Sequence, residues 1–266
     1  MTVASEPSPE VGESADQVSG WFDNHCHLTT LRIDPEDVLN EAASNGVTRM
    51  LTVGCTVEDS REAIGIAARY QNVWATAGVH PHEAADGIDG LSALIDGSDV
   101  VAVGECGLDF HYDHSPRDIQ RVVFADQIQM AIERDLALVI HTREAWAETF
   151  EILDDVGVPD RVVFHCFTGG PAEAEQCLER GAYLSFSGIV TFKSASDLRA
   201  AVRITPPERT LIETDSPYLT PEPHRGKPNR PALVSLVGAA VAAEQSLTVR
   251  EVAGLSWDNG RRLYRL

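Results

Sequence analysis

The sequence predicts an α/β fold: a (β/α)8 barrel of the TIM type with extra helices at its C-terminal end. From Trp21 onward, short apolar segments alternate with longer amphipathic segments, which is typical of parallel strands joined by helices. The apolar segments number eight, as in a closed barrel. A doubly wound open sheet would show a similar alternation. The barrel is favoured because ligand-type side chains end strands that are far apart in the sequence, and only a barrel gathers such ends around one axis.

The elements follow in order along the chain. The predicted strands are the apolar segments 21–27, 48–54, 73–79, 100–105, 136–141, 161–166, 182–187 and 210–214. The predicted helices between them are the segments 35–45, 59–70, 91–95, 116–134, 145–155, 172–179 and 197–202. Gly46, Gly157 and Gly181 stand where three of these helices should end. Two further helices, 232–244 and 248–264, follow the last strand, and Thr248 is a suitable N-cap for the second.

A single large domain is expected over residues 21–266. Residues 1–20 contain four acidic side chains, no basic one and almost no large apolar group, so they cannot recover the entropy that ordering costs. We therefore expect a disordered acidic tail there. No apolar run reaches the roughly 18 residues of a membrane span, and the N-terminus lacks the basic and hydrophobic regions of a secretory signal. We expect no membrane association and no obligate protein partner.

The formal net charge of −20 limits how this chain can bind nucleic acid. It carries 41 acidic and 21 basic residues, and an overall charge of this sign does not attract a long phosphate backbone. If the protein binds nucleic acid, local groups must hold it, and they would hold the end of a nucleic-acid chain.

The five cysteines predict a reducing compartment, and we expect the cytoplasm. Their number is odd and no C-x-x-C pair occurs, which argues against a disulfide framework and against a zinc knuckle. Cys26, Cys106 and Cys166 each follow a candidate metal ligand, so strand alternation should turn them into the outer layer as buried small hydrophobes. Cys55, at the end of the second predicted strand, is given no role.

Six side chains form a candidate metal centre. Two of them are two residues apart on the first strand and therefore project from one face, and the others end later strands. A lone histidine at a strand end is more often a core residue, but four histidines and two carboxylates closing different strands favour a metal centre. The six are His25, His27, Glu105, His141, His165 and Asp215.

Two divalent cations suit this set. His25 and His27, with an oxygen of Asp215, would make the first position. Two more nitrogens, from His141 and His165, would make the second. Glu105 could bridge both ions at the ~3.5–4 Å separation that two-metal hydrolysis uses. Zinc, manganese, cobalt or iron would suit these ligands, and so would magnesium where water completes its shell.

Two further carboxylates lie two residues before a candidate ligand. Asp23 precedes His25, and Glu213 precedes Asp215, so alternation places both on the ligand face, one layer deeper. Each could accept a hydrogen bond from a ligand imidazole, or form a salt bridge inside the barrel. The sequence leaves these alternatives open.

Four other side chains are candidate substrate contacts. His80 follows the third strand and Arg143 lies two residues past His141, so both should point to the mouth of the barrel. Arg225 and Lys227 belong to a basic cluster after the last strand, where they could donate to a phosphate group. An ordinary solvated loop is the alternative for the cluster, and a structural role is the alternative for His80.

Several motifs carry a resemblance to a known family. They are Asp-Asn-His-Cys-His-Leu (23–28), Gly-Val-His-Pro-His (78–82), Val-Gly-Glu-Cys-Gly-Leu-Asp-Phe (103–110), His-Thr-Arg-Glu-Ala (141–145), His-Cys-Phe-Thr-Gly (165–169), Glu-Thr-Asp-Ser-Pro-Tyr-Leu (213–219) and Pro-His-Arg-Gly-Lys-Pro-Asn (223–229). In this order they resemble the TatD family of metal-dependent hydrolases, often described as TatD deoxyribonucleases, within the amidohydrolase-like superfamily. The resemblance covers Trp21 to Leu266. It implies a TIM-like barrel, a binuclear site with the ligands named above, and magnesium-dependent hydrolysis of DNA from 3′ ends.

The sequence thus predicts a hydrolase that cleaves phosphodiester bonds of DNA, or of another phosphodiester substrate, with a metal-activated hydroxide. Asp215 is the expected proton acceptor, and Glu105 is counted as catalytic with it. Two divalent ions are expected, and they are magnesium, manganese or zinc. A hydrolase of carboxylic esters, amides or aminoacyl-tRNA on the same site is an alternative, because the same hydroxide attacks carbonyl groups. A non-catalytic binding protein stabilised by metal is a further alternative.

Overall fold

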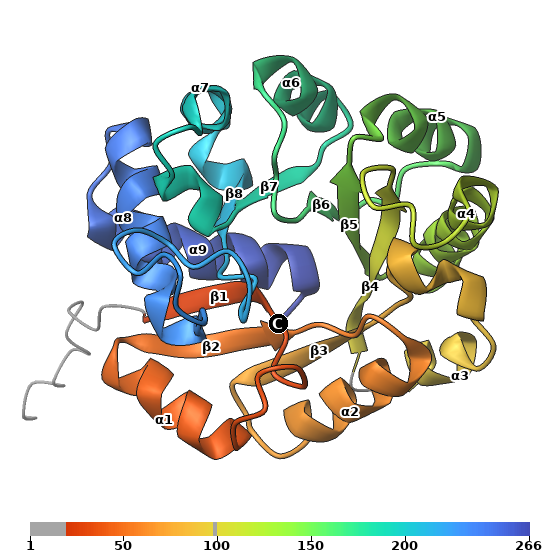
Figure 1. Cartoon of the computed structure of the whole chain (residues 1–266), viewed down its shortest axis with the longest axis horizontal. Coiled ribbons are helices and arrows are strands. Elements are labelled where there is room, and N and C mark those ends of the chain that lie inside the picture. The colour runs from red at the N-terminus through yellow and green to blue at the C-terminus, as the bar shows by residue number, and fades with distance from the viewer. Residues whose placement is uncertain (1–19, 98–99) are drawn as a thin grey trace, which may run out of the picture.

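The computed structural model describes residues 20–97 and 100–266. Eight parallel strands follow one another in chain order around a barrel (Figure 1). They are β1 Trp21–Cys26, β2 Val47–Thr52, β3 Val73–Ala77, β4 Val100–Asp109, β5 Ala137–Arg143, β6 Val162–Phe164, β7 Tyr183–Phe186 and β8 Thr210–Ile212. A bridge from Cys26 to Ser216 closes the barrel between β1 and the segment after β8. The predicted barrel is confirmed, whereas the predicted tail lies outside the described residues except for Gly20.

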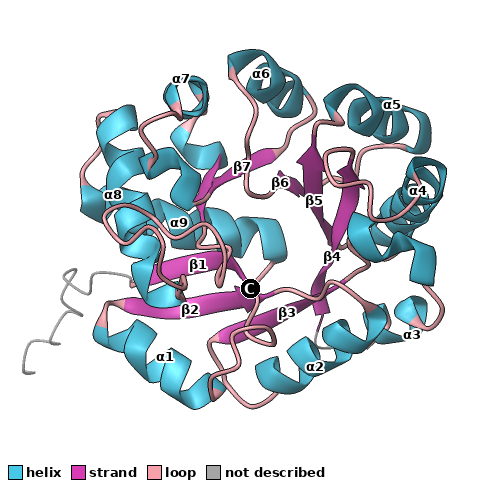
Figure 2. Cartoon of the chain, in the orientation of Figure 1, coloured by secondary structure: helices cyan, strands magenta, loops and turns pink. Residues whose placement is uncertain are grey.

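Helices surround the strands (Figure 2). The α-helices are α1 Pro35–Ser44, α2 Val57–Ala67, α3 Leu91–Ile95, α4 Arg117–Glu133, α5 Trp146–Val156, α6 Pro171–Glu179, α7 Ser196–Ile204, α8 Val234–Gln245 and α9 Val249–Tyr264. Short 3-10 segments are η1 Pro81–Asp86, η2 Gly188–Thr191, η3 Pro207–Arg209 and η4 Pro231–Leu233. Gly46 and Gly181 follow the C-caps of α1 and α6 with left-handed φ angles of 76° and 74°. Thr248 caps α9 by accepting a hydrogen bond from the N–H of Glu251, so the predicted extra helices and this cap are confirmed.

The core has two layers. A large outer cluster packs the strands against the helices and contains Cys26 and Cys106, as strand alternation predicts. A smaller inner cluster lies inside the barrel and includes Phe22. α9 closes the barrel at the end where β1 begins, because Phe22 lies edge-on to Trp257 and Tyr264 with ring centroids 5.9 and 6.4 Å apart. The carboxyl ends of the strands are left to form the mouth.

The strand ends differ from the predicted ones at the positions that matter for the site. β4 continues to Asp109, so Glu105 lies inside this strand rather than at its end. The extension has a partner, since Gly107 and Asp109 pair with His141 and Arg143 of β5. Strands β6 and β8 are shorter than predicted.

No single helix within the described ranges is long and apolar enough to cross a membrane. The helices Pro231–Gln245 and Val249–Tyr264 reach the length and apolar composition of a membrane span only when they are counted together. A bend of 108° separates them.

Candidate metal centre

The first half of the centre combines the end of β1 with the segment after β8. The Nε2 atoms of His25 and His27 are 3.3 Å apart. Asp215 Oδ1 lies 3.2 Å from Nε2 of His27 and 3.8 Å from Nε2 of His25. Closure of the barrel produces this approach, because the N–H of Asp215 donates to the carbonyl of His25 at 2.9 Å.

The second half combines β5 with the end of β6. His141 lies within β5, and His165 follows β6 directly. Nδ1 of His141 is 3.3 Å from Nε2 of His165. The two strands are neighbours in the barrel, and the N–H of His165 donates to the carbonyl of Ile140 at 3.0 Å, so sheet pairing sets this second approach.

Glu105 lies between the two halves. Its Oε2 is 3.3 Å from Nε2 of His25. Its Oε1 is 2.7 Å from Nε2 of His165 and 3.0 Å from Nδ1 of His141. One buried carboxylate therefore presents a different oxygen to each half, and all six predicted side chains converge at one place.

The spacing of these atoms fits divalent cations. Two nitrogens bound to one tetrahedral zinc ion at about 2.0–2.1 Å lie about 3.3–3.4 Å from each other, and both histidine pairs have N···N distances of 3.3 Å. Nε2 of buried His25 faces His27, Glu105 and Asp215, so this nitrogen is the one placed for a cation. The described residues form several overlapping groups of His, Cys, Asp and Glu with ligand-type atoms within 4.8 Å of one another.

The charges of the cluster favour a cation. Burial opposes ionisation of Glu105, but the surrounding histidines, His165 first, hold its pKa well below the usual value. Burial likewise opposes ionisation of Asp215, and its contact with His27 lowers its pKa. Both carboxylates are thus ionised at neutral pH. Although burial acts against the proton on His165, the pKa of this imidazole is raised well above its usual value, chiefly by Glu105, so a cation that binds here displaces a proton.

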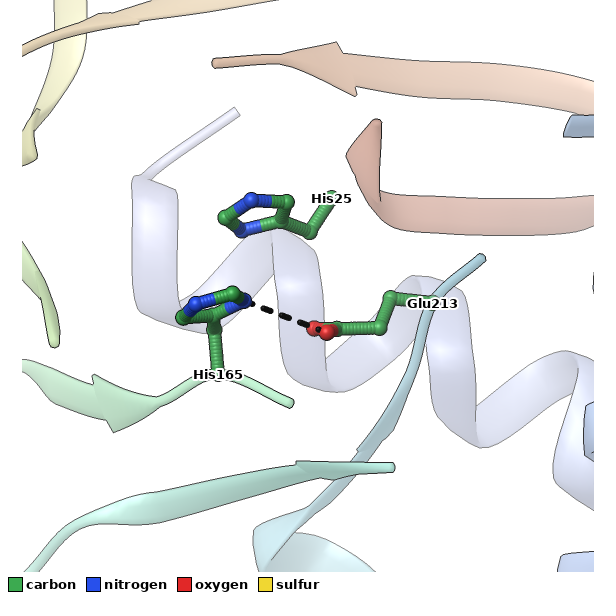
Figure 3. A group of neighbouring side chains, drawn as sticks. All are labelled: His25, His165 and Glu213. Carbon is green, nitrogen blue, oxygen red and sulfur yellow. Dashed lines mark hydrogen bonds and ion pairs between the residues drawn. The ribbon is translucent and has the colours of Figure 1, made fainter. Parts of the chain in front are cut away.

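Glu213 contacts a ligand-type imidazole from outside the cluster. Figure 3 shows His25 and His165 with their rings stacked and Glu213 reaching toward His165; the ring centroids are 3.9 Å apart and the planes differ by 12°. Oε1 of Glu213 is 3.3 Å from Nδ1 of His165 and accepts the N–H of Cys166 at 2.8 Å. The contact fits both predicted alternatives for Glu213, since it can orient the imidazole and is also an ion pair inside the barrel when His165 carries a proton.

Asp23 is placed differently. Its Oδ1 accepts the N–H of Thr214 at 2.8 Å, and its Oδ2 lies 2.6 Å from the Thr214 hydroxyl. Burial raises the pKa of Asp23 to about 8. Among the described residues it bonds to neither an imidazole ring nor a basic side chain, so neither predicted role fits Asp23. It instead anchors the segment that carries Asp215.

Asp109 is a site residue that sequence reasoning missed. Its buried Oδ2 lies 2.9 Å from Nε2 of His82 and 3.3 Å from Nε2 of His141. A carboxylate behind a ligand histidine fixes the ring and its tautomer. The signal was present, because Asp109 is four residues after Glu105 and shares its face once β4 is extended.

His80 lies close to the centre as well as to the mouth. Its Nδ1 accepts the N–H of His82 at 3.1 Å, so in the neutral ring Nε2 carries the proton. That Nε2 lies 3.4 Å from Oε1 of Glu105. Burial lowers the pKa of His80 well below its usual value, which keeps the ring neutral. His80 thus offers a donor N–H rather than a lone pair, although it forms a potential ligand group with Glu105 and His141.

Two cysteines differ from expectation. Cys55, given no role from the sequence, has its Sγ 3.6 Å from Nδ1 of His27 and 3.9 Å from Oε2 of Glu105. Cys166 does not join the buried outer layer, because the chain turns after β6 with φ 40° at this residue; its Sγ lies 3.3 Å from the Ser187 hydroxyl, and the residue lines the cavity above the centre.

A cavity of about 1000 Å³ opens above the cluster at the barrel mouth. His80 and Arg143 line it, so both predicted contacts reach it. Arg225 and Lys227 do not line it, and the guanidinium of Arg225 lies 3.7 Å from the centroid of the Phe192 ring. The basic cluster therefore lies outside the cavity, on the exposed surface of the loop after β8.

The sequence pattern of one family matches nearly the whole chain. The family is described as "TatD related DNase", and the match covers residues 22–265. The chain belongs to this family. The resemblance found in the sequence motifs is thereby confirmed.

Individual relatives agree with this assignment. "Uncharacterized metal-dependent hydrolase YabD" from Bacillus subtilis is 38% identical over 253 residues, covering 92% of this chain and 99% of that protein. "3'-5' ssDNA/RNA exonuclease TatD" from Salmonella typhimurium is 33% identical over 257 residues, with coverage of 92% and 99%. The crystal structure of the TatD homologue YjjV from Escherichia coli K12 has a TM-score of 0.88 at 26% identity, covering 94% of this chain and 99% of that one. This member of the TatD family is a metal-dependent hydrolase.

Proposed function

We propose that this TatD-family protein is a deoxyribonuclease that removes nucleotides from the 3′ end of DNA with two divalent cations. The observation that carries the proposal is the position of Glu105, whose two oxygens face two separate pairs of histidines. A relative named as a 3'-5' ssDNA/RNA exonuclease supports the choice of substrate.

The proposed ligands follow from the measured approaches. His25, His27 and Asp215 would hold one cation together with Oε2 of Glu105. His141 and His165, together with Glu105, would hold the second cation. When bound, magnesium, manganese or zinc would supply Lewis acidity toward the phosphate and lower the pKa of water.

The side chains around this centre have separate tasks. Asp215 is ionised because its pKa is lowered, so one of its oxygens can accept the proton of the attacking water and return it to the leaving oxygen. His80 offers its Nε2–H to a nonbridging phosphate oxygen, and Arg143 offers charge at the wall of the cavity. Glu213 holds the ring of His165 in place through Nδ1.

Arg225 and Lys227 have a more distant task in this proposal. Both are exposed in the loop after β8 and lie outside the cavity. A strand that leaves the mouth over this loop would meet them with phosphates beyond the one being cleaved. They add affinity for a longer chain rather than for the bond that breaks.

A second candidate is a hydrolase of carboxylic esters or amides, including aminoacyl esters. Among the residues that the structure describes, Arg143 is the only arginine or lysine lining the cavity. A substrate without phosphate would suit such a wall. The same cluster could act on a carbonyl group, because the proton acceptor and the ligand set are unchanged.

A metal-screened digestion separates these candidates. Single-stranded DNA labelled at the 5′ or the 3′ end, a p-nitrophenyl phosphodiester and p-nitrophenyl acetate are each incubated with Mg²⁺, Mn²⁺ or Zn²⁺. We expect stepwise shortening of 5′-labelled DNA from its 3′ end and little ester hydrolysis. Ester turnover without DNA shortening would reject the nuclease, and metal-dependent melting with no turnover would indicate a binding protein.

We place this activity in the cytoplasm. All five cysteines are unpaired in the structure, as a reducing compartment requires. The proposed partner is the nucleic-acid substrate alone.

A further inference from the structure

Tyr218 combines a fixed backbone with an exposed ring next to the centre. Its N–H donates to the carbonyl of Asp215 at 2.9 Å, and its own carbonyl accepts the side-chain N–H of Asn229 at 2.6 Å. The ring lines the cavity, with its centroid 5.9 Å from that of His27 and the planes at 69°. Tyr218 is nonetheless 54% exposed. An aromatic ring on a hydrogen-bonded backbone therefore lies beside the centre with more than half of its residue surface exposed.

Tyr112 is the comparison on the same rim. It is 50% exposed and also lines the cavity. Its ring, however, is stacked on His114 with planes 10° apart, and the guanidinium of Arg143 lies 4.6 Å from its centroid. Tyr112 thus already has stacking partners within the protein, whereas the ring contact of Tyr218 within the described ranges is the edge contact with His27.

The cavity wall carries few positive charges that could bind the phosphates of a substrate. The described residues lining the cavity include Asp59, Glu83 and Glu144 in addition to the carboxylates of the centre. Arg143 is the sole arginine or lysine among them, and the chain as a whole has a net charge of −20. Attraction to phosphates is correspondingly weak. Stacking on an aromatic ring is independent of this charge because every base has an apolar face.

We propose that Tyr218 is the platform on which an unpaired nucleobase of the substrate strand stacks, beside the phosphodiester that is cleaved. The inference rests on the proposed nuclease function and adds the part of the substrate that the site recognises. A paired base is covered by its neighbours in the duplex, so only a single-stranded end can place a base on this ring. Tyr218 thereby makes the site selective for single-stranded ends.

Combining a substitution at Tyr218 with removal of a base from the substrate tests whether that base stacks on the ring. Tyr218→Ala and Tyr218→Phe are compared with wild type on end-labelled oligonucleotides, intact or with one abasic residue at each of the last three positions in turn. At one position, loss of the base is expected to lower the wild-type kcat/KM on the order of tenfold, mainly through KM. Tyr218→Ala is expected to lose a similar factor on the intact strand and nothing more on that abasic strand. Tyr218→Phe keeps the ring and is expected to behave as wild type.

The controls make each outcome decisive. Tyr112→Ala, on the same rim, is expected to keep the full discrimination between intact and abasic strands. If the losses from Tyr218→Ala and from base removal multiply at every position, the stacking proposal is wrong while the nuclease stands. If the wild-type protein cuts no oligonucleotide, the proposed nuclease function is wrong. Fluorescence anisotropy then measures binding of the same strands and tests the stacking proposal separately. Equal affinity of wild type and Tyr218→Ala for the intact strand would then reject it, and weaker binding by the variant would support it.

Discussion

Glu105 Oε1 lies 2.7 Å from Nε2 of His165, while Oε2 of the same carboxylate lies 3.3 Å from Nε2 of His25. His25 belongs to β1 and His165 follows β6, so one side chain of β4 contacts groups from two strands that are not its neighbours in the sheet. Oε2 of Glu105 also lies 3.9 Å from Nε2 of His27, and Oε1 lies 3.0 Å from Nδ1 of His141, so this carboxylate contacts all four histidines. The two halves of the centre are therefore coupled through Glu105.

Glu105→Gln should uncouple the two halves. The amide keeps the size of the side chain but loses the charge, and its nitrogen cannot bind a cation, so one of the two approaches is lost. We expect bound metal, measured by elemental analysis after gel filtration, to fall from two ions per chain to one or none, and kcat to fall by at least about 10². Glu144→Gln is the matched control, because Glu144 lines the same cavity but pairs with His111 at 2.8 Å. Unchanged metal content in Glu105→Gln would contradict the bridge.

Asp215→Asn tests the proton acceptor. Asparagine retains an oxygen that can approach His27, but the amide cannot take a proton from water at neutral pH. We expect kcat to fall by about 10²–10⁴ while KM changes little. Steady-state kinetics on single-stranded DNA and elemental analysis of the same preparation separate lost chemistry from lost metal. Full activity in this variant would remove Asp215 from the role.

Asp109→Asn tests the support behind His141. Its Oδ2 lies 3.3 Å from Nε2 of His141 and 2.9 Å from Nε2 of His82, and an amide there weakens both contacts. Replacing such an outer partner typically costs 10–100-fold in metal affinity, and we expect a loss of about that size in competition titrations with a chelating dye. Asp113→Asn is the control from the loop that follows β4, since Asp113 is exposed and pairs with Arg117. Equal affinities for the two variants would argue that Asp109 does not support metal binding through His141.

The sequence predicted the barrel and the six clustered side chains because both depend on local periodicity and on the ends of strands. Asp109 was missed for a different reason. The last residues of β4 are extended because Gly107 and Asp109 pair with His141 and Arg143, and a partner more than thirty residues away leaves no mark on local hydrophobicity. Once that register is known, alternation from Glu105 places Asp109 on the correct face.

Asp23 and Arg225 show the same limit for side-chain partners. The contact between Asp23 and Thr214 joins positions 191 residues apart, and it forms because the barrel closes between β1 and β8. Arg225 lies on Phe192, which belongs to the loop after β7. Charge and spacing predict which groups can bind a ligand, but they do not predict which neighbours from other loops occupy those groups first.

Asp23 gives a test of pH dependence in the metal-free protein. Burial raises its pKa to about 8, whereas an aspartate in an unfolded chain titrates near 3.9. Between these values the folded state holds a proton that the unfolded state has lost. This group therefore lowers the free energy of unfolding as pH rises from about 4 to about 8 and changes it no further above that.

Asp23→Asn removes the titration and keeps a neutral group that can donate to the Thr214 hydroxyl, which in turn donates to Ser216 at 3.1 Å. Thermal melting in EDTA between pH 5 and pH 9 should therefore show the Tm of the variant gaining on that of wild type toward pH 8. A difference in Tm that stays constant with pH would mean that Asp23 is already ionised in the fold.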